Sequence, residues 1–189
     1  EASVLAKDFL ALCDVENPIE KAELLSKCDK NQLKEVYAES EIHKKAAISF
    51  YEEFSTKVIC GDADSDLIFG SIKETTKTTP LSIVCDMNGS ARTLSIDNSY
   101  FNKHGLGFYA INNEPRKIVH AIIPEPENLI YCANEIYRLQ KEGKTDAILG
   151  YMPDCDGDRG NIVFWNKKEK KAEVLKAQEV FALSVLSEL

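Results

Sequence analysis

A chain of 189 residues, 44% of them hydrophobic, is long enough to bury the core of one α/β domain and to carry a smaller helical appendage. Its formal net charge of -8 argues against a nucleic-acid-binding surface, because phosphate binding needs a basic patch and the lysines here are interleaved with glutamates. No window approaches the roughly 20 apolar residues that a membrane span requires, and no signal-like apolar stretch opens the chain. We therefore expect neither nucleic acid nor a membrane as a partner.

Six cysteines are present without a C-x-x-C pair or a regular spacing: Cys13, Cys28, Cys60, Cys85, Cys132 and Cys155. Most of them sit in apolar contexts, which is typical of reduced, buried thiols in a cytoplasmic protein. Neither a disulfide scaffold nor a zinc site is expected. The chain also lacks an initiator methionine and stops inside a helical pattern, so we expect it to be a piece of a longer protein.

Residues 1–72 are predicted to form a helical segment. Asn17 and Pro18 suit the cap and the first turn of a helix. Residues 31–58 then place apolar side chains at three- and four-residue spacing, which predicts a long amphipathic helix. The threonine-rich stretch 73–80 has the composition of a connector or hairpin, and we expect the main domain to begin near this point.

In residues 73–189, strand-like and helix-like patterns alternate. Apolar runs predict strands at 81–86, 106–111, 117–123, 146–151 and 161–165. A helix-sized segment separates the first two strands, and periodic apolar patterns predict helices at 124–143, closed by Gly143, and at 174–189. This order implies βαβ units. The predicted fold class is α/β, a three-layer α/β/α sandwich with a mostly parallel sheet, preceded by the helical segment.

Three aspartates, Asp154, Asp156 and Asp158, alternate directly after the strand predicted at 146–151 and directly before Arg159. The carboxyl ends of strands are where open α/β sheets place their ligand sites. Three carboxylates in a tight loop repel one another unless a cation or several N–H donors compensate them. Because hard oxygen ligands suit Mg²⁺ or Ca²⁺, we interpret the loop as a metal site; the alternative is a solvated acidic turn.

A second acidic run and the histidines are expected to have structural or solvated roles rather than functional ones. The acidic run 61–66 ("GDADSD") has no long buried strand before it and no arginine after it, which favours a solvated turn. The histidines are unclustered in sequence, and structural or solvated roles are predicted for all three, His43, His104 and His120.

Two other kinds of metal loop can be compared with this one. An EF-hand that started at Asp154 would need glycine and glutamate where Arg159 and Trp165 stand, so it is excluded. A haloacid-dehalogenase-like phosphatase shares the D-x-D-G pattern, but it expects threonine or valine at position 158 and needs a downstream lysine and further acidic ligands. That phosphatase and a non-catalytic module that binds Ca²⁺ or phosphoproteins remain as alternatives.

The string "DCDGDR", placed between two strands, resembles the metal-binding loop of the α-D-phosphohexomutase superfamily, the phosphoglucomutases and phosphomannomutases. Residues 81–92 ("LSIVCDMNGSAR") look like the strand and glycine turn that open the second domain of that family. Residues 124–129 ("PEPENL") look like its Pro-x-Pro-Glu stretch, and the closing "LKAQEVFALSVLSEL" is similar to the helix after the metal loop. The resemblance covers residues 76–189.

The resemblance implies an enzyme that interconverts hexose 1-phosphate and hexose 6-phosphate through a phosphoserine. Asp154, Asp156 and Asp158 would hold Mg²⁺, and Arg159 would aim its donors at the phosphoryl group or hold the carboxylates in place. The catalytic serine of the family lies in a Thr-Ala-Ser-His-Asn-Pro-like loop, which this sequence lacks. We therefore expect residues 73–189 to be the second domain of such an enzyme, inactive without the remaining domains of the same polypeptide, with residues 1–72 as the end of the first domain and its connection.

Overall fold

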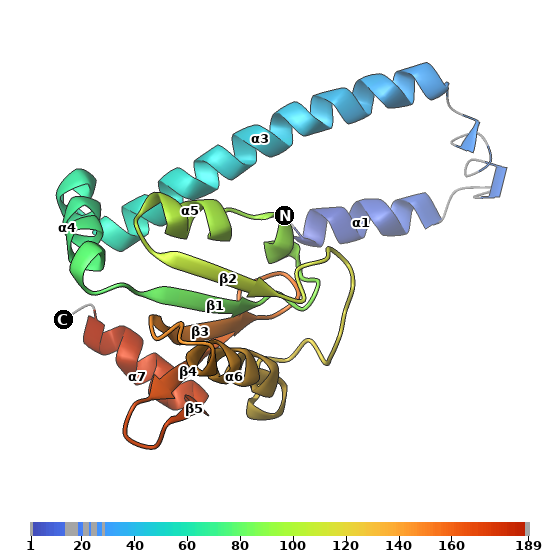
Figure 1. The fold of residues 1–189 in the computed structure, drawn as a ribbon. Helices are drawn as coiled ribbons and strands as arrows, with labels where there is room; N and C mark the ends of the chain where they lie inside the picture. The colour runs from blue at the N-terminus through green and yellow to red at the C-terminus, as the bar shows by residue number, and fades with distance from the viewer. Residues whose placement is uncertain (1, 14–18, 21–22, 24–25, 28, 188–189) are drawn as a thin grey trace. The chain divides into compact units, whose positions relative to one another are not determined.

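The structure, a computed structural model, describes residues 2–13, 19–20, 23, 26–27 and 29–187 (Figure 1). The chain divides into two compact units, residues 1–47 and 48–189. Unit 1 contains α1 (Ala2–Cys13) and the first part of α3 (Lys30–Cys60), which confirms the long helix predicted at 31–58. The helix start predicted at Asn17 and Pro18 lies outside the described residues. Among the helices in the described part of the chain, none is long and apolar enough to cross a membrane.

A five-stranded sheet with the strand order β2-β1-β3-β4-β5 forms the centre of unit 2 (Figure 1). Its strands are β1 (Ser82–Asp86), β2 (Gly107–Ile111), β3 (Ala147–Pro153), β4 (Gly160–Asn166) and β5 (Lys171–Val174). Strand β1 pairs in parallel with β2 and β3, whereas β4 pairs antiparallel with both β3 and β5. Strand β4 therefore runs against the other four strands of the sheet. The predicted α/β class is confirmed, while the sheet is mixed, with two parallel and two antiparallel strand pairs.

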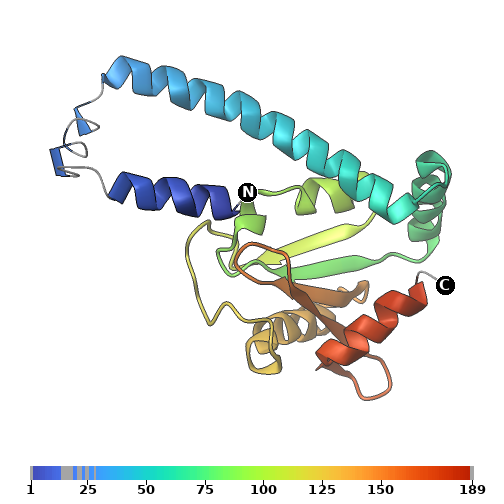
Figure 2. The same ribbon diagram turned by 180° about the vertical axis from the view of Figure 1, so that it is seen from behind.

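Helices cover both faces of this sheet (Figure 2). The connection from β1 to β2 carries the short 3₁₀ helix η1 (Ala91–Leu94) and α5 (Asp97–Lys103), and the connection from β2 to β3 carries α6 (Pro126–Lys141) on the opposite face. Helix α6 starts with proline in its first turn, and just beyond its end Gly143 adopts a φ of +83°, which glycine reaches without steric cost. Helix α7 (Ala177–Ser187) lies near β4.

The main core lies between α6 and the sheet. Its buried residues are Val84, Leu129, Cys132, Ile136, Leu139, Ala147, Met152 and Val163. Burying one valine, leucine, isoleucine or methionine side chain contributes about 1.5 to 3 kcal/mol to the stability of the fold. Strand β3 passes α6 so closely that a Cβ atom on Gly150 would lie 2.5 Å from the Cys132 Sγ, so glycine is required at the crossing.

A second cluster packs α4 (Ser65–Thr78) against α5, and α4 corrects the connector or hairpin predicted for residues 73–80. The helix starts where the Asp64 side chain accepts the backbone N–H of Asp66 at 2.9 Å, and it buries Phe69 beside Tyr100. Its threonines are accommodated in the helix with hydroxyls that donate to carbonyls of the preceding turn, as Thr75 does to Ser71 at 2.9 Å. The connector prediction was based on the threonine content of residues 73–80. It overlooked the spacing of the apolar side chains, which packs α4 against its neighbours.

The strand prediction differs from the structure at two places, one strand predicted wrongly and one missed. Residues 117–123 form a loop rather than a strand, because the Asn88 side chain accepts the backbone N–H groups of Val119 and His120 and donates to the carbonyl of His120. These side-chain bonds satisfy backbone groups of residues 119 and 120 that a neighbouring strand would otherwise satisfy. Strand β5, with only four residues between lysine-rich turns, has no apolar run long enough to predict it.

Cys60, Cys85, Cys132 and Cys155 are free thiols, and the first three are buried as predicted. Burial raises the pKa of Cys85 and of Cys132, so both remain protonated thiols at neutral pH. Cys155 is exposed, because it lies in the surface loop between two aspartates.

His104 makes the second cluster sensitive to acid. Its ring stacks on Phe69 at 3.6 Å between centroids, the residue is 7% exposed, and neither ring nitrogen has a hydrogen-bond partner among the described residues. Burial, followed by the charges of Lys103 and Lys73, lowers the pKa of His104 below its ordinary value of 6.5. The neutral ring therefore stabilises the fold fully above pH 6.5, and this contribution is lost as the pH falls from 6.5 through the lower folded-state pKa.

We predict that His104→Phe reduces the loss of unfolding free energy between pH 7.5 and pH 5, measured by urea denaturation. His43→Phe serves as the control, because His43 is exposed on α3. Equal pH dependence in the wild type and in both variants would contradict this role of His104.

Candidate metal centre

The aspartate loop follows β3, beside the point where the connections from neighbouring strands leave in opposite directions along the sheet. The chain leaves β1 for β2 on one side and returns through α6 to β3 on the other side of β1, so the carboxyl ends of β1 and β3 flank a topological switch point. The backbone N–H of Ala91, in the connection that follows β1, donates to the carbonyl of Cys155 at 3.0 Å. The aspartates thus stand where open α/β sheets bind ligands.

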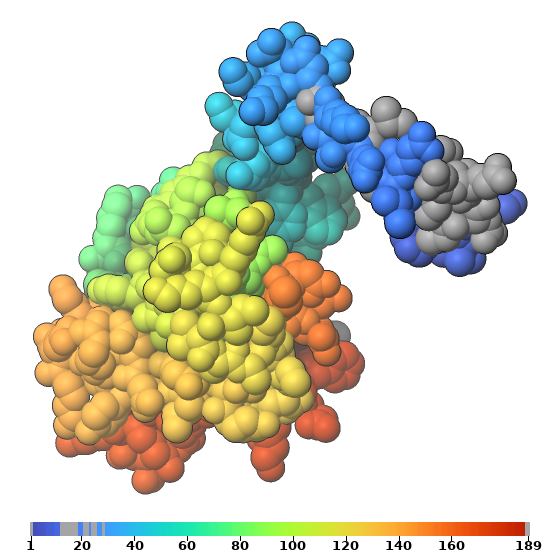
Figure 3. Space-filling model, turned by 90° about the vertical axis from the view of Figure 1, so that its right-hand side faces the viewer, coloured from blue at the N-terminus to red at the C-terminus, as the bar shows by residue number. Residues whose placement is uncertain are grey.

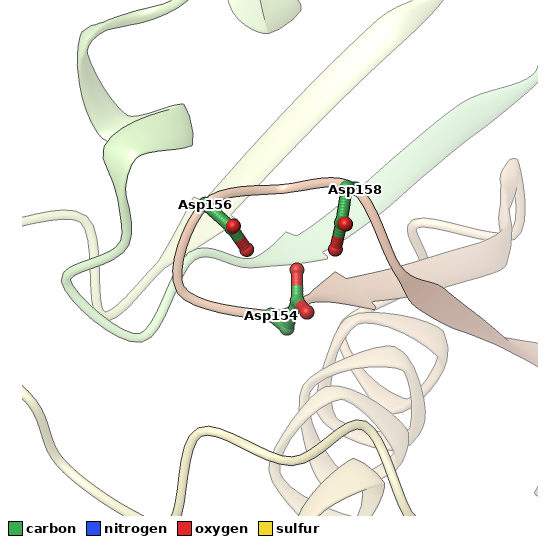
Figure 4. A group of neighbouring side chains, drawn as sticks. All are labelled: Asp154, Asp156 and Asp158. Atoms are coloured by element: carbon green, nitrogen blue, oxygen red, sulfur yellow. The ribbon is translucent and has the colours of Figure 1, made fainter. Parts of the chain in front are cut away.

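The carboxylates of Asp154, Asp156 and Asp158 converge inside the loop (Figure 4). One oxygen from each carboxylate lies within 4.8 Å of the others. Asp154 is only 1% exposed, while Asp156 and Asp158 face solvent. Within the described part of the chain, no other group of three or more acidic, histidine or cysteine side chains is placed to hold a metal ion.

Asp154 organises the loop through its backbone and both carboxylate oxygens. Its N–H donates to the Arg159 carbonyl at 3.0 Å, and its Oδ1 accepts the N–H groups of Gly157 at 3.0 Å and of Arg159 at 3.2 Å. Burial alone would raise the pKa of Asp154, but the hydrogen bonds from the Arg159 backbone, the Arg159 side chain and the Gly157 backbone outweigh it and lower the pKa. Asp154 is therefore ionised at neutral pH despite its burial.

Arg159 compensates one of the three negative charges. Its Nε donates to Asp154 Oδ2 at 2.7 Å and lies 3.7 Å from Asp158 Oδ1, while its side chain stays 74% exposed. The negative charge of Asp156, followed by that of Asp154, raises the pKa of Asp158. The three carboxylates therefore still repel one another in the presence of Arg159. Three carboxylates and one guanidinium leave a formal charge of -2 on hard oxygen donors. This donor set fits a hard divalent cation.

Gly157 lies in the loop with a φ of +81°, in the left-handed region that favours glycine. A Cβ atom there would lie 2.6 Å from Cδ and 2.9 Å from Cγ of Arg92. We predict that Gly157→Ala lowers the unfolding free energy by about 1 to 2 kcal/mol through backbone strain, and also weakens cation binding by displacing Arg92. The matched control is Gly143→Ala, because Gly143 has a φ of +83° but open space around its Cβ position. Equal losses of cation affinity in both variants would contradict the role of the Arg92 contact.

A buried polar network supports the neighbouring turn after β1. Asp86 Oδ2 lies 2.9 Å from His120 Nε2, and Asp86 Oδ1 accepts the Asn112 side chain at 2.8 Å. Asn88 ties residues 119 and 120 to the same turn, and the His120 ring stacks on Tyr131 at 4.2 Å between centroids. His120 is therefore a structural histidine. Sequence reasoning missed the network, although Asp86 at the end of a buried strand is a signal for it.

The loop and the segment 112–125 lie side by side on one face of unit 2 (Figure 3). The Asn161 side chain, just after the loop, donates to the Pro124 carbonyl at 3.2 Å. On the α3 side of the loop lies an open cavity of about 300 Å³. Its lining includes Tyr51, Arg92, Ser95, Asp156 and Asp158.

Comparisons with known proteins show a likeness to solved structures. No protein-family model matches the sequence, and no curated protein does. The chain is similar to a phosphoglucomutase/phosphomannomutase family protein from Burkholderia thailandensis, whose crystal structure aligns with 26% sequence identity and a TM-score of 0.46 over 65% of this chain and 25% of that one. This chain thus spans about a quarter of that protein.

Proposed function

We propose that this chain is part of a phosphohexomutase of the phosphoglucomutase/phosphomannomutase superfamily, which interconverts hexose 1-phosphate and hexose 6-phosphate by phosphoryl transfer through an enzyme phosphoserine. The observation that carries the proposal is the convergence of three carboxylates, one of them buried and ionised, at the switch point of the α/β sheet. The resemblance of the loop and of residues 81–92 to that superfamily gives the reaction class.

In this proposal the chain supplies a preformed binding site for Mg²⁺. Asp154, Asp156 and Asp158 hold the ion, which when bound would neutralise charge on a phosphoryl group. Asp154 fixes the loop and keeps its own charge, while Arg159 holds Asp154 and presents an exposed guanidinium for an anionic substrate. The catalytic serine and the sugar-binding loops would come from the remaining domains of the same polypeptide.

In the phosphatase alternative, Asp154 would be the nucleophile rather than only a metal ligand. Its Oδ1 accepts two backbone N–H groups and its Oδ2 accepts the Arg159 guanidinium. These bonds leave one lone pair on Oδ2, which is available to an ion or for attack on phosphorus. The two functions are distinguished by trapping Asp154 as an acyl phosphate or with a beryllium fluoride mimic, which the phosphohexomutase proposal predicts will fail.

The test compares the 189-residue chain with the complete protein that contains it. Both are assayed for mutase activity with glucose 1-phosphate and with mannose 1-phosphate in the presence of Mg²⁺. We expect the complete protein to convert at least one of the two sugars and the chain alone to convert neither. Turnover by the chain alone, or none by the complete protein with either sugar, would count against the proposal.

A further inference from the structure

Arg92, in η1, forms a support on which the aspartate loop rests. The Cγ and Cδ atoms of Arg92 lie so close to Gly157 that no side chain fits between them. One residue earlier, the N–H of Ala91 donates to the Cys155 carbonyl at 3.0 Å. The loop therefore contacts this segment twice, once through a hydrogen bond and once through van der Waals packing on the hydrocarbon part of an arginine.

The guanidinium of Arg92 is fixed from the opposite side. Its Nη2 donates to Asp97 Oδ1 at 2.6 Å, and its Nη1 donates to the Tyr51 hydroxyl of α3, whose ring centroid lies 5.4 Å from the Arg92 Cζ. The arginine side chain is 21% exposed and that of Asp97 is 2% exposed. A charge-assisted bond shielded in this way holds the arginine in one rotamer.

Asp97 also reaches the strand that enters the loop. The hydroxyl of Tyr151, on β3, donates to the same Asp97 Oδ1 that accepts Arg92. Asp97 is therefore bonded both to the strand three residues before Asp154 and to the arginine beneath Gly157. Tyr51, Arg92 and Asp97 form a brace that connects α3, η1, α5 and β3 with the back of the loop. None of its members is among the carboxylates that converge within 4.8 Å.

We propose that Arg92, held by Tyr51 and Asp97, is a positioning residue that keeps the aspartate loop closed. Three carboxylates with one arginine partner repel one another, so an unsupported loop would relax by moving its exposed aspartates apart. The brace opposes this relaxation without touching the carboxylates. Its role in ordering the loop is independent of the proposed function, whereas its effect on cation affinity rests on that function.

Two variants test the brace in the 189-residue chain. Tyr51→Phe removes one hydroxyl and keeps the ring. The double variant Arg92→Leu with Asp97→Asn removes the ion pair without leaving a buried charge unpaired. The control is Tyr37→Phe, which removes a hydroxyl from an exposed tyrosine of the same helix. The readouts are amide hydrogen exchange at Gly157 and Arg159, whose N–H groups bond to Asp154, the Mn²⁺ dissociation constant, and the thermal unfolding midpoint.

We expect Tyr51→Phe to speed exchange at both loop amides and to weaken Mn²⁺ binding by roughly threefold to tenfold, which corresponds to one hydrogen bond, while the unfolding midpoint falls by only a few degrees. The double variant should weaken binding further, and Tyr37→Phe should match the wild type. Wild-type exchange at Gly157 and Arg159 in Tyr51→Phe would overturn the proposal, even if the double variant failed to fold.

The two proposals fail in different ways. If the wild type does not bind Mn²⁺ but loop exchange quickens in the variants, the metal assignment falls and the positioning role of Arg92 stands. If the wild type binds Mn²⁺ and neither exchange nor affinity changes in the variants, the positioning role falls and the metal assignment stands.

Discussion

Replacing Asp154 with asparagine is expected to weaken cation binding by about a hundredfold or more. Asp154 is the buried member of the carboxylate group, and it is ionised because of the hydrogen bonds it accepts from Gly157 and Arg159. Asparagine removes the charge from the centre of the loop and places an amide group against the Arg159 guanidinium. Loss of a partner that only orients a metal ligand already costs about tenfold to a hundredfold in affinity, and loss of a charged ligand should cost at least as much.

The measurement is a calorimetric titration of the chain with Mg²⁺ and with Mn²⁺. Because the loop supplies three protein ligands, the wild-type affinity for Mg²⁺ should be weaker than micromolar. Asp62→Asn is the matched control, since Asp62 is an exposed aspartate in the acidic run 61–66 and belongs to no metal-ligand group. Equal affinities in Asp154→Asn and in the wild type, or sub-micromolar Mg²⁺ binding by the wild type, would contradict this account of the loop.

The largest effect on stability is expected for Leu129→Ala. Leu129, on α6, is fully buried in the main core, where the truncation leaves a cavity. Such a change costs about 2 to 5 kcal/mol, a large part of the roughly 5 to 15 kcal/mol that stabilises a domain. The next residue of the same helix, Ile130, is 52% exposed, and Ile130→Ala should change the unfolding free energy by less than about 1 kcal/mol.

Urea denaturation followed by circular dichroism measures both variants. A loss from Leu129→Ala no larger than that from Ile130→Ala would contradict the packing of α6 on the sheet. A large loss from both variants would instead mean that Ile130 is covered in solution.

Local patterns of apolar residues predicted most of the sheet, because buried parallel strands are short continuous apolar runs. Strands β1 and β3 were found in this way, and α6 was found from its proline start and its Gly143 end. The same rule failed at residues 117–123, where the apolar run pairs with the Asn88 side chain rather than with a strand. It also failed for β5, which is too short to show a pattern.

The aspartate loop could be predicted because its chemistry is contiguous in sequence, from Asp154 to Arg159. The brace behind it could not, because Tyr51, Arg92 and Asp97 come from three helices and meet only in the folded chain. The sequence gives no sign that a tyrosine in a long amphipathic helix reaches an arginine 41 residues away. The predicted domain boundary near residue 72 stays a prediction about the longer protein, while the described structure divides between Ala47 and Ile48.

The most direct test of the metal assignment is anomalous diffraction from crystals of the chain grown with Mn²⁺, with data collected near the manganese edge. The account predicts one anomalous peak among Asp154, Asp156 and Asp158, about 2 Å from an oxygen of each carboxylate, and its loss in Asp154→Asn crystals. A bound Mn²⁺ at another position, or an ordered loop without any peak at saturating Mn²⁺, would contradict it.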